Sequence, residues 1–461
     1  MKPRSLIVHW GNLLQLLRGR IQVSSSESRR IFKGMLSVAA FLFIAKSIAA
    51  IKEVALAYSL GTAEQLDGHL FVFGLASWPV SVFAAALWFG LTPVLVKLRS
   101  KDAVAAREIA KDLSSLSAWM AVLMSFVTAA VLSWFLESGL AGLGSAATSA
   151  AIQSVVFVSF FVFFSGLAAF YSTWLMSAQR HANTLLEAFP AACISVSLLV
   201  WPWLFSSDLG VTPLNIGLVF GAAIQLYVLL KLTKADVGLS MAWPSRHSNV
   251  WRLLRGIGVA LVAQIIMSST VLVDTLVLGH MGGGAITSFS YASRIMALAI
   301  SMTAMVIGRA VLPVFAAQTD RATSWSLAKS WGRRMFALGC AGALFIALFA
   351  EAAVTLLFER GAFTPSDTVR VAELLTWLGF QLPFYMASTV WFNWLVSDGA
   401  QKAYLAMALV GLLVKLVAVG FLYPLGAAGL AVSTVLVCLV HWLVVFCFVL
   451  RHARENRSLE F

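Results

Sequence analysis

The residues of this chain that could do chemistry are ionisable side chains placed inside long apolar stretches. The first stretch carries Lys46, Lys52 and Glu53, and two later stretches carry Asp274 and Arg294. A charge at the centre of a bilayer costs at least about 2.5–3.5 kcal/mol, so each of these groups needs a partner or a function. If the three bases face one cavity with the two acids, that cavity favours an anion. A pyrophosphate would meet such a site with charge-assisted hydrogen bonds.

Each charge of the first stretch also has a structural alternative. Lys52 and Glu53 are sequence neighbours, and they can form an ion pair that neutralises both charges inside the protein and has no role in binding. Lys46 lies near the middle of the stretch and has no partner of its own there. On an α-helix, Lys46 and Glu53 lie two turns apart and within about 20° of each other, with Lys52 offset. We therefore expect Lys46 to face a cavity.

The later stretches allow a structural alternative as well. Asp274 and Arg294 fall at a similar depth in consecutive spans, so a salt bridge between these two residues competes with a role in binding. Lys415 lies in another span, and we interpret it only as a structural residue inside the helix bundle.

The elements that hold these residues must be membrane helices. Of the 461 residues, 60% are apolar and 11% are charged, whereas soluble domains have about 45–50% and 25%. This composition excludes a soluble enzyme, a secreted disulfide scaffold and a disordered chain. The net charge of +13 is explained by basic connections between spans, so we expect no nucleic-acid partner. No P-loop, HExxH or GxSxG motif occurs, and we expect no enzyme activity.

The predicted fold is an all-α polytopic membrane protein with about twelve transmembrane helices. A span needs about 20 apolar residues. Twelve stretches meet this requirement, at roughly 35–58, 69–97, 114–136, 151–177, 184–206, 213–232, 254–279, 285–316, 334–358, 370–397, 403–423 and 427–450.

The distribution of basic residues predicts how these spans are oriented. Lys and Arg gather before the first span and in every second connection after it. The alternate connections hold little more than Arg360 and the boundary residue Arg370. Because cytoplasmic loops collect Lys and Arg, both termini are predicted to be cytoplasmic. The predicted parts are a basic cytoplasmic segment 1–34, an N-lobe 35–232, a cytoplasmic linker 233–253, a C-lobe 254–450 and a cytoplasmic tail 451–461.

Two stretches about 220 residues apart share a pattern. Glu53 is followed after eight residues by Gly61, and Asp274 is followed after eight residues by Gly282. A proline then ends the next span, 40 residues after the acid in the first copy and 39 in the second. Six spans per copy give both copies the same orientation, which predicts a parallel repeat with a substrate site between two lobes. Chance similarity between apolar segments is the alternative.

Several short motifs resemble those of one known family. In Leu357–Thr364, Gly361 can end one helix and Thr364-Pro365-Ser366-Asp367 can cap the next. This connection resembles the one before the tenth span of MurJ (MviN-type) lipid II flippases. Further similar segments are Ser290–Met296, which resembles the family's Tyr-Ala-x-Arg-Leu-Met, Lys52-Glu53 with Gly61 and Asp67, and Pro424-Leu425-Gly426 with Gly429-Leu430 and Thr434.

The resemblance implies a fold and an activity. The fold is that of the MOP exporter superfamily, with two six-helix lobes around a central cationic cavity. The activity is translocation of an undecaprenyl-pyrophosphate-linked saccharide across the bacterial inner membrane by alternating access. This substrate would be lipid II or a related cell-wall or exopolysaccharide precursor. Membrane lipids and proteins of cell-wall or polysaccharide synthesis are the expected partners.

The resemblance also implies roles for individual residues. Lys46, Lys52 and Arg294 match positions where the family has cavity arginines that receive the pyrophosphate, and Glu53 and Asp67 belong to the same substrate-binding pattern. Asp274 and Thr434 match positions that are linked to cation coupling in the family. The resemblance therefore implies Na⁺ or H⁺ as a coupling ion.

Two other functions remain open at this stage. One is a MATE-like, ion-coupled exporter of small cations, which should expose unpaired acids to its substrate. The other is a transport-inactive scaffold in a polysaccharide-synthesis complex. The scaffold alternative rests on a departure from the family pattern, because Ala76–Trp88 holds no charge where the family has an arginine pair. In a further departure, which concerns sodium coupling, Val414 and Ala418 stand where polar cation ligands are expected.

Overall fold

The computed structural model describes residues 26–178, 183–205, 210–238, 250–317, 321–397 and 402–457. Within these ranges the regular structure is helical, and no strand occurs. Among the described residues, seven helical stretches are long and apolar enough to cross a membrane, and Phe189–Leu204 is a shorter apolar helix. Each of the twelve predicted stretches falls on a helix or on consecutive helices. The predicted all-α membrane architecture is therefore confirmed.

The first half of the chain folds around α6, which packs against α3, α5 and α9. The helices α8 and α9 approach closely because Gly217 and Gly221 have no Cβ atom to meet the backbone of Ile194 and Pro190. The elements of this half are α2 (Ser26–Leu60), α3 (Glu64–Ala86), the π-helical turn η1 (Leu87–Leu91), α4 (Thr92–Lys101), α5 (Ala103–Glu137), α6 (Ser145–Ser177), α7 (Asn183–Leu186), α8 (Phe189–Leu204) and α9 (Thr212–Thr233).

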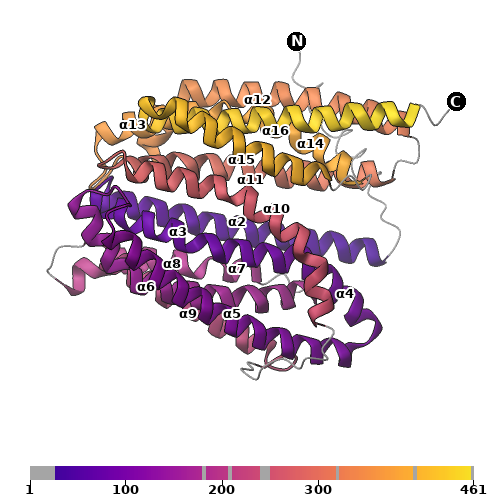
Figure 1. Ribbon diagram of the computed structural model, residues 1–461, viewed down its shortest axis with the longest axis horizontal. Coiled ribbons are helices and arrows are strands. Elements are labelled where there is room, and N and C mark those ends of the chain that lie inside the picture. Colours follow the sequence, from indigo (N-terminus) through magenta and orange to yellow (C-terminus); the bar gives the residue numbers. More distant parts are fainter. Residues whose placement is uncertain are drawn as a thin grey trace, which may run out of the picture.

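The second half forms a separate layer above the first in Figure 1. Its helix α10 crosses between the two layers, since it packs against α3 of the first half and α15 of the second. The elements of this half are α10 (Val250–Gly279), α11 (Ala285–Ala317), α12 (Arg321–Phe358), α13 (Pro365–Gly379), α14 (Leu382–Ser397), α15 (Lys402–Leu422), η2 (Tyr423–Leu425) and α16 (Gly426–Arg457).

The predicted segment boundaries differ from the structure at three places. Helix α2 begins at Ser26, inside the predicted segment 1–34, and residues 1–25 lie outside the described residues. Part of the predicted linker 233–253 also lies outside them, at 239–249, and α10 already begins at Val250. Helix α16 continues to Arg457, through most of the predicted tail, and residues 458–461 are not described. The polar ends of these helices extend beyond the apolar stretches from which the spans were predicted.

The predicted cap between α12 and α13 is confirmed. Gly361 has φ +67°, a left-handed conformation that favours glycine. Thr364 then caps α13 through a capping box with Asp367, and Pro365 is the first helical residue. This turn meets α2 directly, because the backbone N–H of Ala362 donates to the carbonyl oxygen of Tyr58 at 2.9 Å.

We call the end of the bundle where α2 leads into α3 the Gly61 end. There the two halves are tied together by short contacts. Thr62 donates to Asp367 at 2.5 Å, and the hydroxyl of Tyr291 donates to the carbonyl oxygen of Gly61 at 3.1 Å. The beginning of α2 and the end of α16 lie at the opposite end (Figure 1). The halves are therefore closed against each other at the Gly61 end.

Candidate substrate and ion sites

An ion triad joins the two halves of the molecule. Atom Oε1 of Glu53 on α2 lies 2.7 Å from Nζ of Lys52 and 2.9 Å from Nε of Arg294 on α11. The side chain of Glu53 is 9% exposed, that of Lys52 12% and that of Arg294 40%. One carboxylate thus holds two bases, and the triad keeps a net charge of +1. Its most accessible member is the guanidinium of Arg294.

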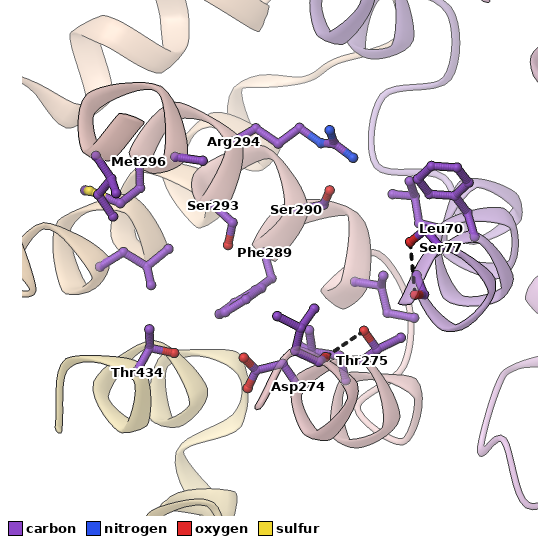
Figure 2. A pocket seen from close by; sticks show the side chains of 18 of the residues that line it. Leu70, Ser77, Asp274, Thr275, Phe289, Ser290, Ser293, Arg294, Met296 and Thr434 are labelled. Atoms are coloured by element: carbon purple, nitrogen blue, oxygen red, sulfur yellow. Dashed lines mark hydrogen bonds between the residues drawn. The ribbon is translucent and has the colours of Figure 1, made fainter. Parts of the chain in front are cut away.

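Arg294 lines a central cavity between the halves. This central cavity has a volume of about 400 Å³, within the range of small-molecule sites. Its walls come from α3, α10, α11, α16 and the α13–α14 turn. Figure 2 shows Arg294 on one side of the cavity and Asp274 and Thr434 on the other. The polar lining residues are Ser77, Asp274, Thr275, Ser290, Ser293, Arg294, Gln381 and Thr434.

A second cavity, which we call the side cavity, is lined by two of the three predicted basic residues. Its volume is about 210 Å³, and Lys46, Glu53 and Arg294 line it. Lys46 is exposed, as expected for a cavity-facing base. The structure therefore brings Lys46 and Arg294 to one cavity, whereas Lys52 is paired with Glu53 and lines neither the central nor the side cavity. The sequence-based alternative of an ion pair between Lys52 and Glu53 is also present, but Arg294 shares that pair.

The predicted alternative of a salt bridge between Asp274 and Arg294 is wrong. Asp274 pairs instead with Lys415 of α15, whose Nζ lies 2.6 Å from Oδ1. The same ammonium donates to Ser433 and to Thr434 of α16, each at 2.9 Å. The sequence shows Lys415 within a span but does not predict its pairing with Asp274. The reason is that the direction of a side chain on α15 depends on how the helix rotates as it packs.

Asp67 lies away from both cavities. Its side chain is buried and accepts hydrogen bonds from the backbone N–H of Gly284 and of Thr287, both at 2.7 Å, and from the Thr287 hydroxyl at 2.6 Å. These groups form the first turn of α11, where an acid is favoured by unpaired N–H groups and the helix dipole. The structure therefore places Asp67 as a cap that ties α3 to α11, separate from the Lys52, Glu53 and Arg294 triad with which it was grouped.

The repeated acids each precede a glycine with a positive φ angle and each pair with a base. Glu53 precedes Gly61, which has φ +54°, and Asp274 precedes Gly282, which has φ +80°. Each acid is held by a base at short distance, Glu53 by Lys52 and Arg294, and Asp274 by Lys415. The spacing found in the sequence thus corresponds to a left-handed glycine after each acid.

Comparison with known proteins assigns this chain to a family. The model of the family "Lipid II flippase MurJ" matches residues 37–459 of the chain. The chain belongs to the lipid II flippase MurJ family. It is 25% identical to the lipid II flippase MurJ of Burkholderia cenocepacia over 371 residues, which cover 76% of this chain and 70% of the relative. This MurJ-family chain is accordingly a multi-pass membrane protein.

Solved structures show the same fold. A structure of lipid II flippase MurJ in an inward closed conformation has a TM-score of 0.76 and 17% identity, and the match covers 90% of this chain and 87% of that one. An inward-facing multidrug resistance MATE transporter of the MOP superfamily has a TM-score of 0.71 and 16% identity, covering 91% and 99%. The predicted MOP-type fold is therefore confirmed.

Proposed function

We propose that this MurJ-family protein translocates a lipid-linked saccharide that carries a pyrophosphate, either lipid II or a related cell-wall or exopolysaccharide precursor. The movement runs from the cytoplasmic to the outer leaflet of a bacterial inner membrane by alternating access. The single observation that carries the proposal is the triad in which Glu53 joins Lys52 of one half to Arg294 of the other.

The triad suits a pyrophosphate for three reasons. Its net charge is +1, so an anion completes its charge balance. Arg294 offers a planar fork of N–H donors, which matches phosphate oxygens in two places at once. The pyrophosphate would also contact bases of both halves, so that its binding stabilises one relative position of the halves more than another. A transported ligand needs such differential affinity to shift the conformational equilibrium.

The cavity charges disfavour the cation-exporter alternative. Such an exporter needs an acid that is free to meet its substrate. Two acids line the central and side cavities within the described residues, Asp274 and Glu53. Asp274 is paired with Lys415, and Glu53 with two bases. Neither acid is left for a cationic substrate.

The orientation of the protein follows from its basic residues. We propose that the Gly61 end faces outward and that both termini are cytoplasmic, because Lys and Arg gather in the connections at the opposite end. Arg99 and Arg107 lie there, and both pair with Asp236, at 3.4 and 3.3 Å. The contacts at the Gly61 end then close the cavities against the outside, as a state that receives substrate from the cytoplasmic leaflet requires.

The test is complementation in a bacterium depleted of its own lipid II flippase. The wild-type chain should restore growth and lower the lipid II that accumulates in the inner leaflet. The double variant Lys52→Ala, Arg294→Ala should fail at equal membrane abundance. A matched control, Lys329→Ala with Arg333→Ala, removes one lysine and one arginine that are exposed on α12, and it should rescue.

Two outcomes would contradict the proposal in different ways. Rescue by the cavity double variant would refute the anion site. Failure of the wild-type chain would refute lipid II as the substrate, and depletion in the native host would then identify the polyprenyl-linked intermediate that accumulates. Accumulation of no such intermediate would favour the scaffold alternative.

A further inference from the structure

The ammonium of Lys415 sits in a cage of oxygen atoms. Its Nζ lies 2.6 Å from a carboxylate oxygen of Asp274 and 2.9 Å from the hydroxyl oxygens of Ser433 and Thr434. The Lys415 side chain is 1% exposed. Three helices, α10, α15 and α16, therefore meet around one buried positive charge.

The two hydroxyl groups are oriented as ligands for a cation. The Ser433 hydroxyl donates its proton to the carbonyl oxygen of Leu430 at 2.7 Å, and the Thr434 hydroxyl donates to the same carbonyl at 3.1 Å. With their protons engaged there, the lone pairs of both oxygens face Nζ. Carboxylate and hydroxyl oxygens are also the ligands that hard metal cations take.

The cage borders the central cavity. Asp274 and Thr434 belong to the cavity lining (Figure 2), and the side chain of Asp274 is 16% exposed. An ion that entered the cavity from water would reach these two residues first. It would find the cage filled, because the Lys415 ammonium already contacts all three oxygen atoms. A tethered ammonium competes for the oxygens as an intramolecular ligand, and a free ion would have to shed water to displace it.

We propose that Lys415 is a resident cation, which occupies the place where Asp274, Ser433 and Thr434 would otherwise bind a monovalent alkali ion. The coupling Na⁺ expected at Asp274 and Thr434 therefore does not fit this chain. The consequence for transport, which rests on the proposed flippase function, is that translocation proceeds without Na⁺ binding at this site. Removal of the amine should create an alkali-ion site lined by the three oxygens.

The inference can be tested by the thermal stability of the purified full-length protein in detergent, without any transport assay. Tm is compared in NaCl, KCl and choline chloride at equal ionic strength. The wild-type protein should show the same Tm in NaCl and choline chloride. Lys415→Ala should be less stable overall, and NaCl should raise its Tm above the choline value by about 2 °C or more, because an ion that binds only the folded state stabilises it.

Two further variants make the test specific. Lys329→Ala removes an exposed lysine of α12 and should behave as the wild type does in all three salts. Lys415→Ala combined with Asp274→Asn should lose the sodium effect, because the carboxylate of the cage is gone. If Lys415→Ala does not fold, the more conservative Lys415→Gln takes its place, and ²²Na⁺ binding to the wild-type protein is measured directly.

The outcomes separate this inference from the flippase proposal. A sodium-specific rise in the Tm of the wild-type protein, or ²²Na⁺ binding that Asp274→Asn abolishes, would overturn the resident cation. So would a folded Lys415→Ala protein that shows no sodium effect. Failure of the wild-type chain to complement would refute lipid II as the substrate and leave the salt results unaffected.

Discussion

Replacement of Arg294 by alanine tests the anion site most sharply. The substitution removes the most exposed base of the triad and leaves Glu53 paired with Lys52 alone, so that the local charge falls from +1 to zero. A hydrogen bond to a charged group contributes about 1.5–3 kcal/mol. Because each 1.4 kcal/mol is a factor of ten in affinity, Kd for a pyrophosphate ligand should rise about 10- to 150-fold.

The assay is binding of undecaprenyl pyrophosphate to the protein in nanodiscs, followed by tryptophan fluorescence or thermophoresis at fixed ionic strength. The side chain of Arg294 is 40% exposed, so the lower part of the range is expected. Arg294→Lys should give an intermediate Kd, since it keeps the charge and loses the planar fork. Arg333→Ala, at an exposed position on α12, is the matched control and should leave Kd unchanged.

The reasoning fails if Arg294→Ala binds the ligand within about twofold of the wild type, because that change is below 0.5 kcal/mol. It also fails if Arg333→Ala weakens binding as much as Arg294→Ala does. In that case general surface charge, and not the triad, would attract the ligand.

Three further predictions concern other parts of the molecule. Lys52→Arg should complement a flippase-depleted strain better than Lys52→Gln at equal abundance, because the triad needs the charge; equal growth of the two would argue against this. Asp67→Asn should lower Tm by about 2–5 °C, since a buried carboxylate with three hydrogen bonds loses its charge, and an unchanged Tm would remove Asp67 as a tie between α3 and α11. Burial acts to raise the pKa of Asp367, which lies outside the predicted tenth span, but hydrogen bonds from Thr62 and Thr364 lower the pKa below its usual value. Its stabilising effect should therefore be present above about pH 4 and be lost as the pH falls below that value; Asp367→Asn should flatten the decline of Tm in this window, and an equally steep decline would contradict the linkage.

Local patterns in the sequence were sufficient to predict the positions of the helices and the cap between α12 and α13. The apolar stretches predicted every span position, and the Gly361–Asp367 cap was predicted residue by residue. Both depend on short-range physics, since a helix needs a certain apolar length to cross the bilayer and its first turn needs acceptors for unpaired N–H groups. The acid-to-glycine spacing also pointed to two glycines that both have a positive φ angle.

The sequence did not predict which side chains on different helices contact each other. The depth of Asp274 in the membrane could be counted from its span, but the direction of its side chain depends on how α10, α15 and α16 rotate as they pack. Arg294 was the candidate partner by depth, whereas the packed helices pair Asp274 with Lys415. Asp67 was grouped with the triad by its place in a motif, whereas a separate contact with the first turn of α11 determines its surroundings.

The position of the pyrophosphate in a bound complex tests the central claim most directly. Cryo-electron microscopy of the protein with an undecaprenyl-pyrophosphate-linked saccharide, on a scaffold that enlarges the particle, would locate the two phosphorus atoms. We predict phosphate oxygens within about 3 Å of the Arg294 guanidinium, at charge-assisted hydrogen-bond distance, with Lys52 at the second contact. Phosphate density outside the central and side cavities, with Glu53 still holding Lys52 and Arg294 as in the free protein, would contradict the account.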